Sequence, residues 1–412
     1  MKNEDVCPPA CAAQAIMPSI FWKNHLRDLC GSRNVHRLLT IRHIALALLA
    51  GFSSAAMAQA EQSVAIGLAG PLTGSAAHWG KDNENGARLA LEELNQRGLV
   101  IGGKKITFVL DSQDDQADPK QAMMVANKLV DSGVKGMLGH FNSGAAIPAS
   151  AVYNRAGLPS ISTATNPTFT KQGYRNVFRI VASDEDVGVA LAHYVVKVMK
   201  AQKIAIIDDR TAYGQGAAEV FERTVRALGA NVVDQQYTSD KSLDFMAILT
   251  AIKSKQPDAI FYGGMDAQGG LIARQMKQLG IQAKLLGTDG LCTNEIVKIS
   301  AASVDGMLYC TRGGKEVGSV PKGAAFEQRY KTRFGTEALT YSPYFYDAMM
   351  TLAAAMQTAN SVEPKQYIGA IRQLKQEGVT GWVSFDEKGN LKEPDFTLST
   401  YKDGKRVKVA GS

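Results

Sequence analysis

The chain has 412 residues and a formal net charge of +7, and 45% of its residues are apolar. This length predicts two core-forming units, because single hydrophobic cores seldom grow beyond about 250 to 300 residues. Removing the first 60 residues lowers the net charge to +4 and leaves no run of basic residues, which excludes a nucleic-acid-binding surface.

The first 60 residues have the pattern of a leader segment. Arginines precede a short apolar stretch over 44–52, and two overlapping Ala-x-Ala sites follow it. These features are typical of a cleaved secretory signal peptide, and the apolar stretch is too short for a stable membrane anchor. We therefore expect the chain to be exported and processed, so that the mature protein is soluble and begins at Gln59 or Glu61.

Two of the five cysteines, Cys292 and Cys310, lie outside the leader segment. An exported protein folds in an oxidising compartment, where paired cysteines form disulfides. We therefore predict one disulfide between Cys292 and Cys310 in preference to a metal pair.

The exported chain begins with alternating strands and helices. Apolar runs predict the strands, and apolar residues at helical spacing predict the helices between them. In order, we predict a strand over 63–69, a helix that ends at Gly98, a strand over 105–110, a helix that begins at Pro119 after the N-cap Asp118, and a strand over 134–138. This βαβαβ order is typical of a parallel sheet covered by helices.

The same alternation restarts after Val181, which predicts a second sheet of the same kind. We expect strands over 204–207, 231–233, 259–262 and 285–286, and helices over 184–200, 216–228, 245–254 and 271–279. The chain then returns to helices, over 322–334, 344–357 and 365–373, and ends in a hairpin turned at 402–404. Two similar α/β lobes should therefore face each other.

A small polar loop follows the strand over 134–138. It leads through Gly139 and Ser143 into a predicted helix over 145–155. At a helix N-terminus, unpaired backbone N–H groups and the positive end of the helix dipole favour an anion, and the Ser143 hydroxyl adds a donor. A second strand and loop over 158–166 follow, and the loops of neighbouring parallel strands leave the sheet at the same edge. The two loops are therefore predicted to share one small ligand with a carboxylate group.

Four further side chains follow predicted strand ends and are candidates for contact with that ligand: Trp79, Tyr213, Met265 and Asp289. For an aromatic residue in such a loop, the alternative is a half-buried packing role. Asp289 is a lone carboxylate in a glycine-rich loop beside apolar strands, which suits the ammonium group of a ligand. Its alternative role is to cap the predicted helix over 293–300.

No group of residues in the sequence suggests catalysis, a cofactor or a metal. None of the glycine-rich turns matches a phosphate loop or a dinucleotide loop. His78, His140 and His193 have no partner at metal-ligand spacing, so we interpret them as packed or surface side chains.

Short motifs along the whole exported chain resemble the leucine/isoleucine/valine-binding family. These proteins are periplasmic solute receptors of ABC importers. The matching strings are Asp114-Asp115-x-x-Asp118-Pro-Lys-Gln121, Ala126-Asn-Lys128, Gly139-His140, Pro148-Ala-Ser150, Ile204-Ala-Ile-Ile-Asp208, Tyr213-Gly-x-Gly216, Tyr262-Gly-Gly264 and Phe385-Asp-Glu-Lys-Gly-Asn-Leu-Lys392.

The resemblance implies the type I periplasmic binding protein fold, an α/β fold with two Rossmann-like parallel-sheet lobes joined by three hinge crossovers. It places the crossovers near residues 183, 314 and 395, the first lobe at 61–183 and 315–395, and the second lobe at 184–314 and 396–412. It also implies a monomer without a cofactor or enzymatic activity, which delivers its solute to the permease subunits of an ABC transporter in the inner membrane.

The resemblance also implies roles for individual residues. The family's ligand contacts correspond here to Ser143 and Thr165 for the carboxylate, the backbone around Thr163 and the side chain of Asp289 for the ammonium, Tyr213 from the second lobe, and Trp79 and Tyr341 at the side-chain pocket. Asn142 and Met265 complete the predicted set. The departures from the family are Asp289 in place of a glutamate, Met265 in place of an aromatic residue, and Gln116 with Asn142 in place of a disulfide.

We therefore predict a periplasmic substrate-binding protein of an ABC importer that binds a branched-chain amino acid, or a related amino-acid-like solute, between its two lobes. A ligand-sensing domain for a receptor partner is one alternative, and a receptor for a related acid or amide is another. A third alternative is a secreted α/β enzyme, against which the lack of a paired base and nucleophile argues.

Overall fold

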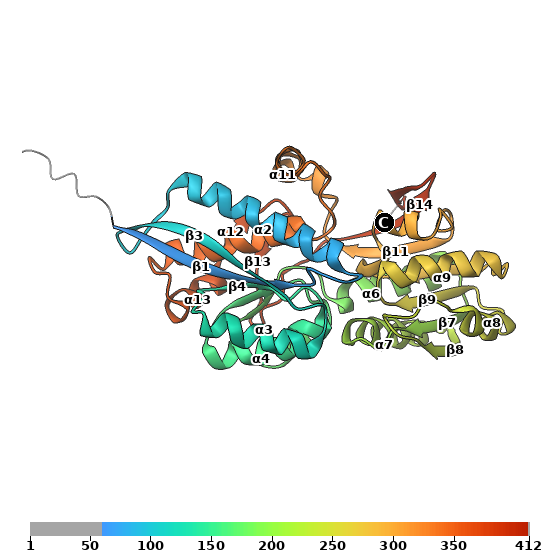
Figure 1. Ribbon diagram of the computed structural model, residues 1–412. Helices are drawn as coiled ribbons and strands as arrows, with labels where there is room; N and C mark the ends of the chain where they lie inside the picture. Colours follow the sequence, from blue (N-terminus) through green and yellow to red (C-terminus); the bar gives the residue numbers. More distant parts are fainter. Residues whose placement is uncertain (1–59, 411–412) are drawn as a thin grey trace, which may run out of the picture. The chain divides into compact units, whose positions relative to one another are not determined.

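The computed structural model of the protein describes residues 60–410 (Figure 1). The predicted leader, apart from Ala60, lies outside the described residues. Within residues 60–410, no helix is long and apolar enough to span a bilayer. These residues form two large β-sheets, each covered by helices, and one small two-stranded sheet. This confirms the predicted α/β class with two mainly parallel sheets.

The first sheet has six strands in the order β2, β3, β1, β4, β5, β6, and only β2 and β3 are antiparallel neighbours. Its strands are β1 (Glu61–Gly70), β2 (Val100–Ile101), β3 (Lys104–Asp114), β4 (Met137–Gly139), β5 (Ser160–Ser162) and β6 (Val177–Arg179). In β1, Val64, Ile66 and Leu68 belong to one hydrophobic cluster, whereas Ala65 and Ala69 pack in another. Since successive side chains of a strand point to opposite faces, both faces of this sheet are buried.

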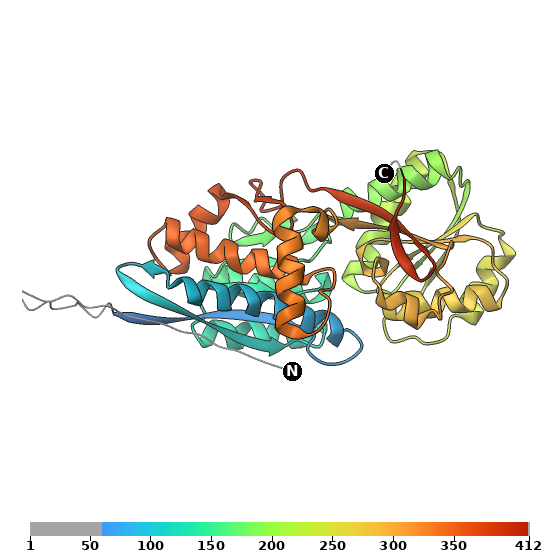
Figure 2. The ribbon, with the colours of Figure 1, turned by 90° about the horizontal axis from the view of Figure 1, so that it is seen from above.

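Helices cover the two faces of the first sheet (Figures 1 and 2). The cluster on one face includes residues of α2 (Ala77–Arg97), α11 (Pro321–Phe334), α12 (Ser342–Thr358) and α13 (Pro364–Gln373), and the cluster on the other includes residues of α3 (Pro119–Asp131) and α4 (Ser143–Ala156). The short helix α5 (Thr168–Lys171) precedes β6. Helix α12 packs against α2 at close range, because a Cβ atom on Gly86 would lie 2.0 Å from the carbonyl oxygen of Ser342.

The second sheet has seven strands in the order β15, β14, β11, β10, β9, β7, β8. Its strands are β7 (Lys203–Asp208), β8 (Asn231–Tyr237), β9 (Ala259–Gly263), β10 (Lys284–Gly287), β11 (Leu308–Gly313), β14 (Phe396–Lys402) and β15 (Lys405–Lys408). The last two form the predicted hairpin, which is red in Figure 2; β14 pairs antiparallel with β11, and β15 pairs antiparallel with β14. Ala205 and Ile207 of β7 pack in one cluster and Ile204 and Ile206 in another, so this sheet is also buried on both faces.

The helices that accompany the second sheet come mainly from the middle of the chain. They are α6 (Asp184–His193), which continues as the π-helical turn η1 (Tyr194–Val198), α7 (Ala212–Ala227), α8 (Met246–Ser254), α9 (Asp266–Gln278), the 3-10 turn η2 (Asp289–Leu291) and α10 (Glu295–Ile299). The 3-10 turn η3 (Val317–Ser319) and the small sheet of β12 (Lys375–Glu377) and β13 (Trp382–Ser384) lie outside both large sheets.

The chain passes three times between elements of the first sheet and elements of the second. The first passage joins β6 to α6, the second leaves β11 towards α11, and the third enters β14. The second and third run side by side, because the N–H of Gly314 donates to the carbonyl of Asp395 at 2.7 Å and the hydroxyl of Thr397 donates to the carbonyl of Gly314 at 2.8 Å.

Several predicted boundaries differ from the structure. The strand expected over 134–138 is β4, which begins at Met137 and ends at Gly139, and the helix expected from 145 already begins at Ser143. The helix expected over 293–300 is shorter, and η2 precedes it. Periodicity locates an element, but its ends depend on hydrogen bonds that the pattern of apolar residues does not record.

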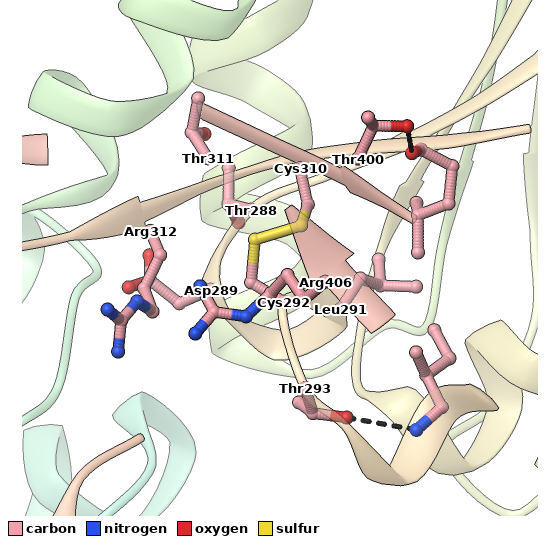
Figure 3. The surroundings of a disulfide bond; sticks show 12 residues. Thr288, Asp289, Leu291, Cys292, Thr293, Cys310, Thr311, Arg312, Thr400 and Arg406 are labelled. Atoms are coloured by element: carbon pink, nitrogen blue, oxygen red, sulfur yellow. Dashed lines mark hydrogen bonds between the residues drawn. A yellow bond between two sulfur atoms is a disulfide. The ribbon is translucent and has the colours of Figure 1, made fainter. Parts of the chain in front are cut away.

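The predicted disulfide is present. Cys292 and Cys310 are bonded, with their Cα atoms 5.6 Å apart, and both side chains are buried. The bond ties the loop after η2 to β11, beside Asp289 and Arg312 (Figure 3).

We expect removal of this disulfide to lower the free energy of unfolding by about 3 kcal/mol, because the closed loop restricts the unfolded chain. The sequence separation of 18 residues sets that scale. The measurement is guanidinium unfolding of the wild type and of the double variant Cys292→Ser with Cys310→Ser. A reducing agent should weaken the wild type and leave the double variant unchanged; equal stability of the two proteins without reductant would contradict the prediction.

Candidate functional site

The structure brings seven of the nine predicted ligand-binding residues to one small pocket. In this structure the pocket is nearly closed, with a cavity volume of about 10 Å³, and it is lined by Asn142, Ser143, Thr163, Thr165, Tyr213, Met265 and Tyr341, together with Phe141 and Ala164. Its residues follow strands of both large sheets, and helix α12 begins directly after Tyr341. Of the remaining two predicted residues, Trp79 packs on two residues of the lining, and the loop of Asp289 is bonded to a third, Tyr213.

The N-terminus of α4 is one side of this pocket. Asn142 is its N-cap in extended conformation, and the Asn142 side chain does not cap the helix. The carbonyl of Asn142 already accepts from the N–H groups of Ala145 and Ala146, at 3.2 and 2.9 Å. The earlier N–H groups of a first helical turn have no helical acceptor, so this end of α4 suits an anion.

The loop after β5 is held against the loop after β4 by hydroxyl groups. The Thr163 hydroxyl donates to the carbonyl of Phe141 at 3.1 Å, and the Ser162 hydroxyl donates to the carbonyl of His140 at 2.6 Å. Ser143 accepts from the N–H of Asn166 at 3.2 Å. The two predicted loops are therefore bonded into one unit.

Arg179 holds the same loop in place, and the sequence did not point to it. Its guanidinium donates to the carbonyls of Ala164, Thr165 and Asn166, at 2.9, 2.6 and 2.9 Å. The side chain is buried, and burial lowers the pKa of Arg179 to about 10, although nearby carboxylates oppose the shift. Arg179 stays charged at neutral pH and fixes three carbonyl groups of this loop by hydrogen bonds.

His140 has a structural role, in agreement with its interpretation as a packed side chain. It is buried next to the pocket loop, with Nδ1 2.6 Å from Oδ2 of Asp115 and Nε2 2.9 Å from the Tyr153 hydroxyl oxygen. The two other histidines outside the leader differ, because His78 is paired and His193 is exposed. Among the described residues, no cluster of three metal-ligating side chains occurs.

Two buried carboxylates lie beside the pocket. Asp289 is 1% exposed; its Oδ1 accepts from the N–H of Gly313 at 2.9 Å, and its Oδ2 has no partner within the described residues. Asp184 is fully buried, and its oxygens make no complete hydrogen bond within the described residues, although the Thr165 side chain is close enough to oppose the rise in its pKa. Its backbone N–H donates to the carbonyl of the pocket residue Thr165 at 2.9 Å. A buried carboxylate is costly to ionise without a cation, so this pair of carboxylates suits a cationic group.

The electrostatics of the two carboxylates support this interpretation. Burial raises the pKa of Asp184 to about 8, and the charge of Asp289 adds to the shift. Burial also raises the pKa of Asp289 to about 6, although the N–H of Gly313 opposes the change. A buried ammonium group would reverse both shifts, because an opposite charge favours the ionised form.

The sequence pattern did not single out Asp184. It lies in the run Ser183-Asp-Glu-Asp186, where Ser183 and Asp186 form a capping box at the start of α6. Acidic residues in the first turn of a helix are usually solvent-exposed and favourable to the dipole, so nothing local marks Asp184 as buried. Its burial becomes evident only from the tertiary structure, in which Asp184 contacts the loop of Thr165.

Tyr213 positions the Asp289 loop. Its hydroxyl oxygen lies 2.9 Å from the Thr288 hydroxyl and accepts from the N–H of Gly290 at 2.9 Å. Burial raises the pKa of Tyr213 well above its ordinary value, and the charges of Asp184 and Asp289 add to this, so the phenol stays neutral. Tyr213, which follows a strand of the second sheet, therefore contacts both the pocket and the Asp289 loop.

Aromatic side chains form the remaining wall. The Trp79 ring centroid lies 5.6 Å from that of Phe141 and 5.3 Å from that of Tyr341, and all three side chains are buried. Phe141 was not among the predicted site residues, although it stands in the predicted loop. The half-buried Met265 packs against the same cluster. The wall is apolar and suits a hydrocarbon side chain.

Asn142 and Gln116 are the two positions at which the family resemblance predicts the loss of a disulfide. Asn142 contacts the loop that holds Gln116. The Asn142 amide donates to the carbonyl of Ala117 at 3.4 Å, which is a weak contact. Its Oδ1 is buried without a partner within the described residues.

Comparisons with known proteins show the family of the chain. A family model described as "Periplasmic binding protein" matches residues 63–405. The Leu/Ile/Val-binding protein homolog 1 of Brucella suis is 35% identical over 88% of this chain and 95% of its own length. A leucine-, isoleucine-, valine-, threonine- and alanine-binding protein of Pseudomonas aeruginosa is 33% identical over 89% of this chain and 97% of its own.

Solved structures show the same fold. A leucine-binding protein, LivK, from Thermotoga maritima superposes with a TM-score of 0.77 at 26% identity and covers 84% of this chain and 98% of its own. LivJ from Streptococcus pneumoniae, solved in complex with isoleucine, gives a TM-score of 0.74 at 27% identity and covers 84% of this chain and all of its own.

Replacing Asp184 with Asn should stabilise the ligand-free protein at alkaline pH. Because the pKa of Asp184 is raised in the folded state, the wild type loses stability as the pH rises from about 4 towards 8, where the folded protein has to carry a buried charge. We expect a gain of about 1 to 3 kcal/mol in the free energy of unfolding at pH 9, the scale of an unpaired buried polar group.

Denaturant unfolding at several pH values provides the measurement. Asp131 is a matched control, because it is an exposed carboxylate at the end of α3, and Asp131→Asn should leave the pH profile unchanged. An Asp184→Asn variant no more stable than the wild type at pH 9 would show that Asp184 is solvated or paired.

Proposed function

The chain belongs to the periplasmic binding protein family, and from this we propose that it is the substrate-binding protein of a branched-chain amino acid ABC importer. The observation that carries the proposal is the charge pattern of the site. An anion-binding helix N-terminus at Ser143 and the two unpaired carboxylates Asp184 and Asp289 belong to the surroundings of one small pocket. That pattern is complementary to the zwitterionic head group of an α-amino acid.

In this proposal the ligand carboxylate lies at the N-terminus of α4. It accepts from the Ser143 and Thr165 hydroxyls and from N–H groups of the first turn, while Arg179 holds the carbonyls of the neighbouring loop by hydrogen bonds. The ammonium group pairs with Asp289 and Asp184. Its arrival favours the ionised form of both carboxylates, so that binding near neutral pH releases a proton, mainly from Asp184.

The ligand side chain then faces the apolar wall. Trp79, Phe141 and Tyr341 are packed against one another, so they are fixed in place, whereas Met265 is a flexible side chain that adapts to different shapes. An aliphatic side chain gains from burial there at about 25 cal/mol per Å² of apolar surface. The related LivJ is named as a complex with isoleucine, which supports this class of ligand.

Binding requires motion but no reaction. We propose that residues 61–183 with 315–395 form one lobe, that residues 184–314 with 396–412 form the other, and that they close on the ligand about crossovers near residues 183, 314 and 395. Closure excludes water, so each charge contact in the site becomes stronger than at the surface. The closed form is then the one that the permease subunits in the inner membrane recognise.

Asp289→Ala should weaken L-leucine binding by at least about 30-fold, because losing one partner of a desolvated charge pair costs about 2 to 5 kcal/mol. Met265→Ala removes apolar contact only, so it should change the preference among leucine, isoleucine and valine and keep the head-group contacts. Isothermal titration calorimetry of both variants gives the dissociation constants.

The control ligand is 4-methylpentanoate, which is leucine without its amino group. It should bind the wild type weakly, and Asp289→Ala should not weaken it further. Leucine affinity of Asp289→Ala within about threefold of the wild type would overturn the assigned role. Tight binding of 4-methylpentanoate by the wild type would instead identify a receptor for acids. A thermal-shift screen of small metabolites is the first step, since a ligand at 100 times its dissociation constant adds about 2.7 kcal/mol of stability.

We also propose that the protein reaches the periplasm through a cleaved signal peptide. The expected mature N-terminus is Gln59 or Glu61, just before β1 begins or at its first residue. Mass spectrometry of protein from the periplasmic fraction measures it directly. Periplasmic protein that still carries residues 44–52 would contradict the proposal.

A further inference from the structure

Asp266 is a buried carboxylate that joins the two halves of the protein outside the head-group site. It is the first residue of α9, beside the second sheet, and its side chain is 1% exposed. Its Oδ2 accepts from the Thr293 hydroxyl at 2.8 Å, a contact within the same half. From the other half, the indole Nε1 of Trp79 lies 3.4 Å from Oδ1, and Nε2 of His78 lies 3.4 Å from Oδ2.

The contacts of Asp266 with His78 and Trp79 lie next to the residues that line the pocket. Trp79 packs on Phe141 and Tyr341, which line the pocket, and Met265, the residue before Asp266, lines it from the opposite half. Thr293 holds the Asp266 carboxylate in its own half, so the carboxylate presents a fixed acceptor to helix α2. A motion that separates the two halves breaks the contacts of Asp266 with His78 and Trp79 and keeps the contact with Thr293.

The contact between Asp266 and His78 is an ion pair only when the His78 imidazole is protonated. Burial by itself would lower the pKa of the His78 imidazole, but the hydrogen bond and charge of Asp266, aided by the charge of Glu295, outweigh it and raise the pKa above its ordinary value of 6.5. The other charged groups of the cavity that His78 lines are Arg312 of β11, Glu316 before η3, Glu327 of α11, Glu337 before α12 and Arg406 of β15. Arg312 and Arg406 both pair with Glu316, Lys298 pairs with Glu295, and Lys331 pairs with Glu337. Asp266 is therefore the main charge that acts on the imidazole, and Glu295 adds to it.

We propose that Asp266 is a positioning residue that latches the closed form by holding Trp79 and His78 across the cleft, and that protonation of His78 strengthens this latch. The inference rests on the proposed closure of two lobes around an amino acid. Asp266 does not contact the ligand in this account. It acts by setting the position of Trp79 and by stabilising the form that retains the ligand.

The direction of the pH effect follows from the two forms. In the open form Asp266 is absent from the surroundings of His78, so the imidazole has a lower pKa than in the closed form. The closed form therefore binds a proton more tightly, and its extra stability is fully present below the pKa of the open form. It is lost as the pH rises through the raised pKa of the closed form.

Asp184 and Asp289 act in the opposite direction, because acid protonates them and weakens their pairing with an ammonium group. The test therefore compares His78→Gln with the wild type at each pH, so that the contribution of the two carboxylates cancels. Calorimetry with L-leucine at pH 5.5, 7 and 8.5 and constant ionic strength gives the ratio of the dissociation constants, variant over wild type. We expect a ratio of about three- to fivefold at pH 5.5, the scale of a partly exposed ion pair, and a ratio within about twofold at pH 8.5.

Two further variants separate a latch from a general loss of packing. His193→Gln changes an exposed histidine at the end of α6 and should give a ratio near one at every pH. Asp266→Asn keeps the shape and the acceptor for Trp79 but removes the charge that attracts the protonated imidazole. Adding His78→Gln to Asp266→Asn should therefore cause no further loss of leucine affinity at pH 5.5, because the two residues act on one contact.

Small-angle X-ray scattering of the ligand-free proteins measures their compactness and tests the latch without a ligand. The wild type should become more compact between pH 8.5 and 5.5, and His78→Gln should show a smaller change. A variant-to-wild-type ratio that is constant with pH, together with equal scattering changes in both proteins, would overturn the latch. If the wild type binds no amino acid, the proposed function fails, and the scattering comparison still decides whether the latch exists.

Discussion

The burial of two carboxylates without a cation is the physical constraint on which the rest of this structure depends. Burial and the charge of Asp289 raise the cost of ionising Asp184, so Asp184 is mostly protonated near neutral pH in the ligand-free site. In the proposed function, the ammonium group of an α-amino acid relieves that cost, and the carboxylate of the same ligand lies at the N-terminus of α4. The proposed affinity then has two sources, which are the relief of buried charge and the new contacts in the complex.

The two carboxylates remain without a cation only if the neighbouring side chains are held in place by other contacts. Arg179 illustrates this, because its guanidinium binds three backbone carbonyls of the loop at Thr165 and does not turn towards Asp184. Tyr213 holds Gly290 and Thr288, and the disulfide of Cys292 ties the following loop to β11. These contacts keep the acceptor and donor groups of the site in place before the ligand arrives, which lowers the cost of ordering them on binding.

The elements that carry the site also lie next to the passages between the two sheets. Asp289 accepts from the N–H of Gly313 at the end of β11, and Gly314 then pairs with the backbone of Asp395. On the far side of the aromatic wall, Asp266 contacts Trp79 and His78. In the two proposals, the charges that bind the head group and the charge that holds the halves together are separate, so ligand recognition and closure should respond differently to pH.

Local patterns were sufficient to predict the alternation of strands and helices, the helix that follows the loop at Gly139 and the disulfide, because each is visible in the order of apolar, glycine, cysteine or capping residues. Only the packing of the elements established that Asp184 is buried, that Arg179 holds the Thr165 loop, and that Asp266 reaches Trp79. Each of these depends on residues distant in sequence, and Asp184 has the local pattern of an exposed helix start. Periodicity reports which face of an element is apolar, but the partner of a polar side chain is set by how the elements pack.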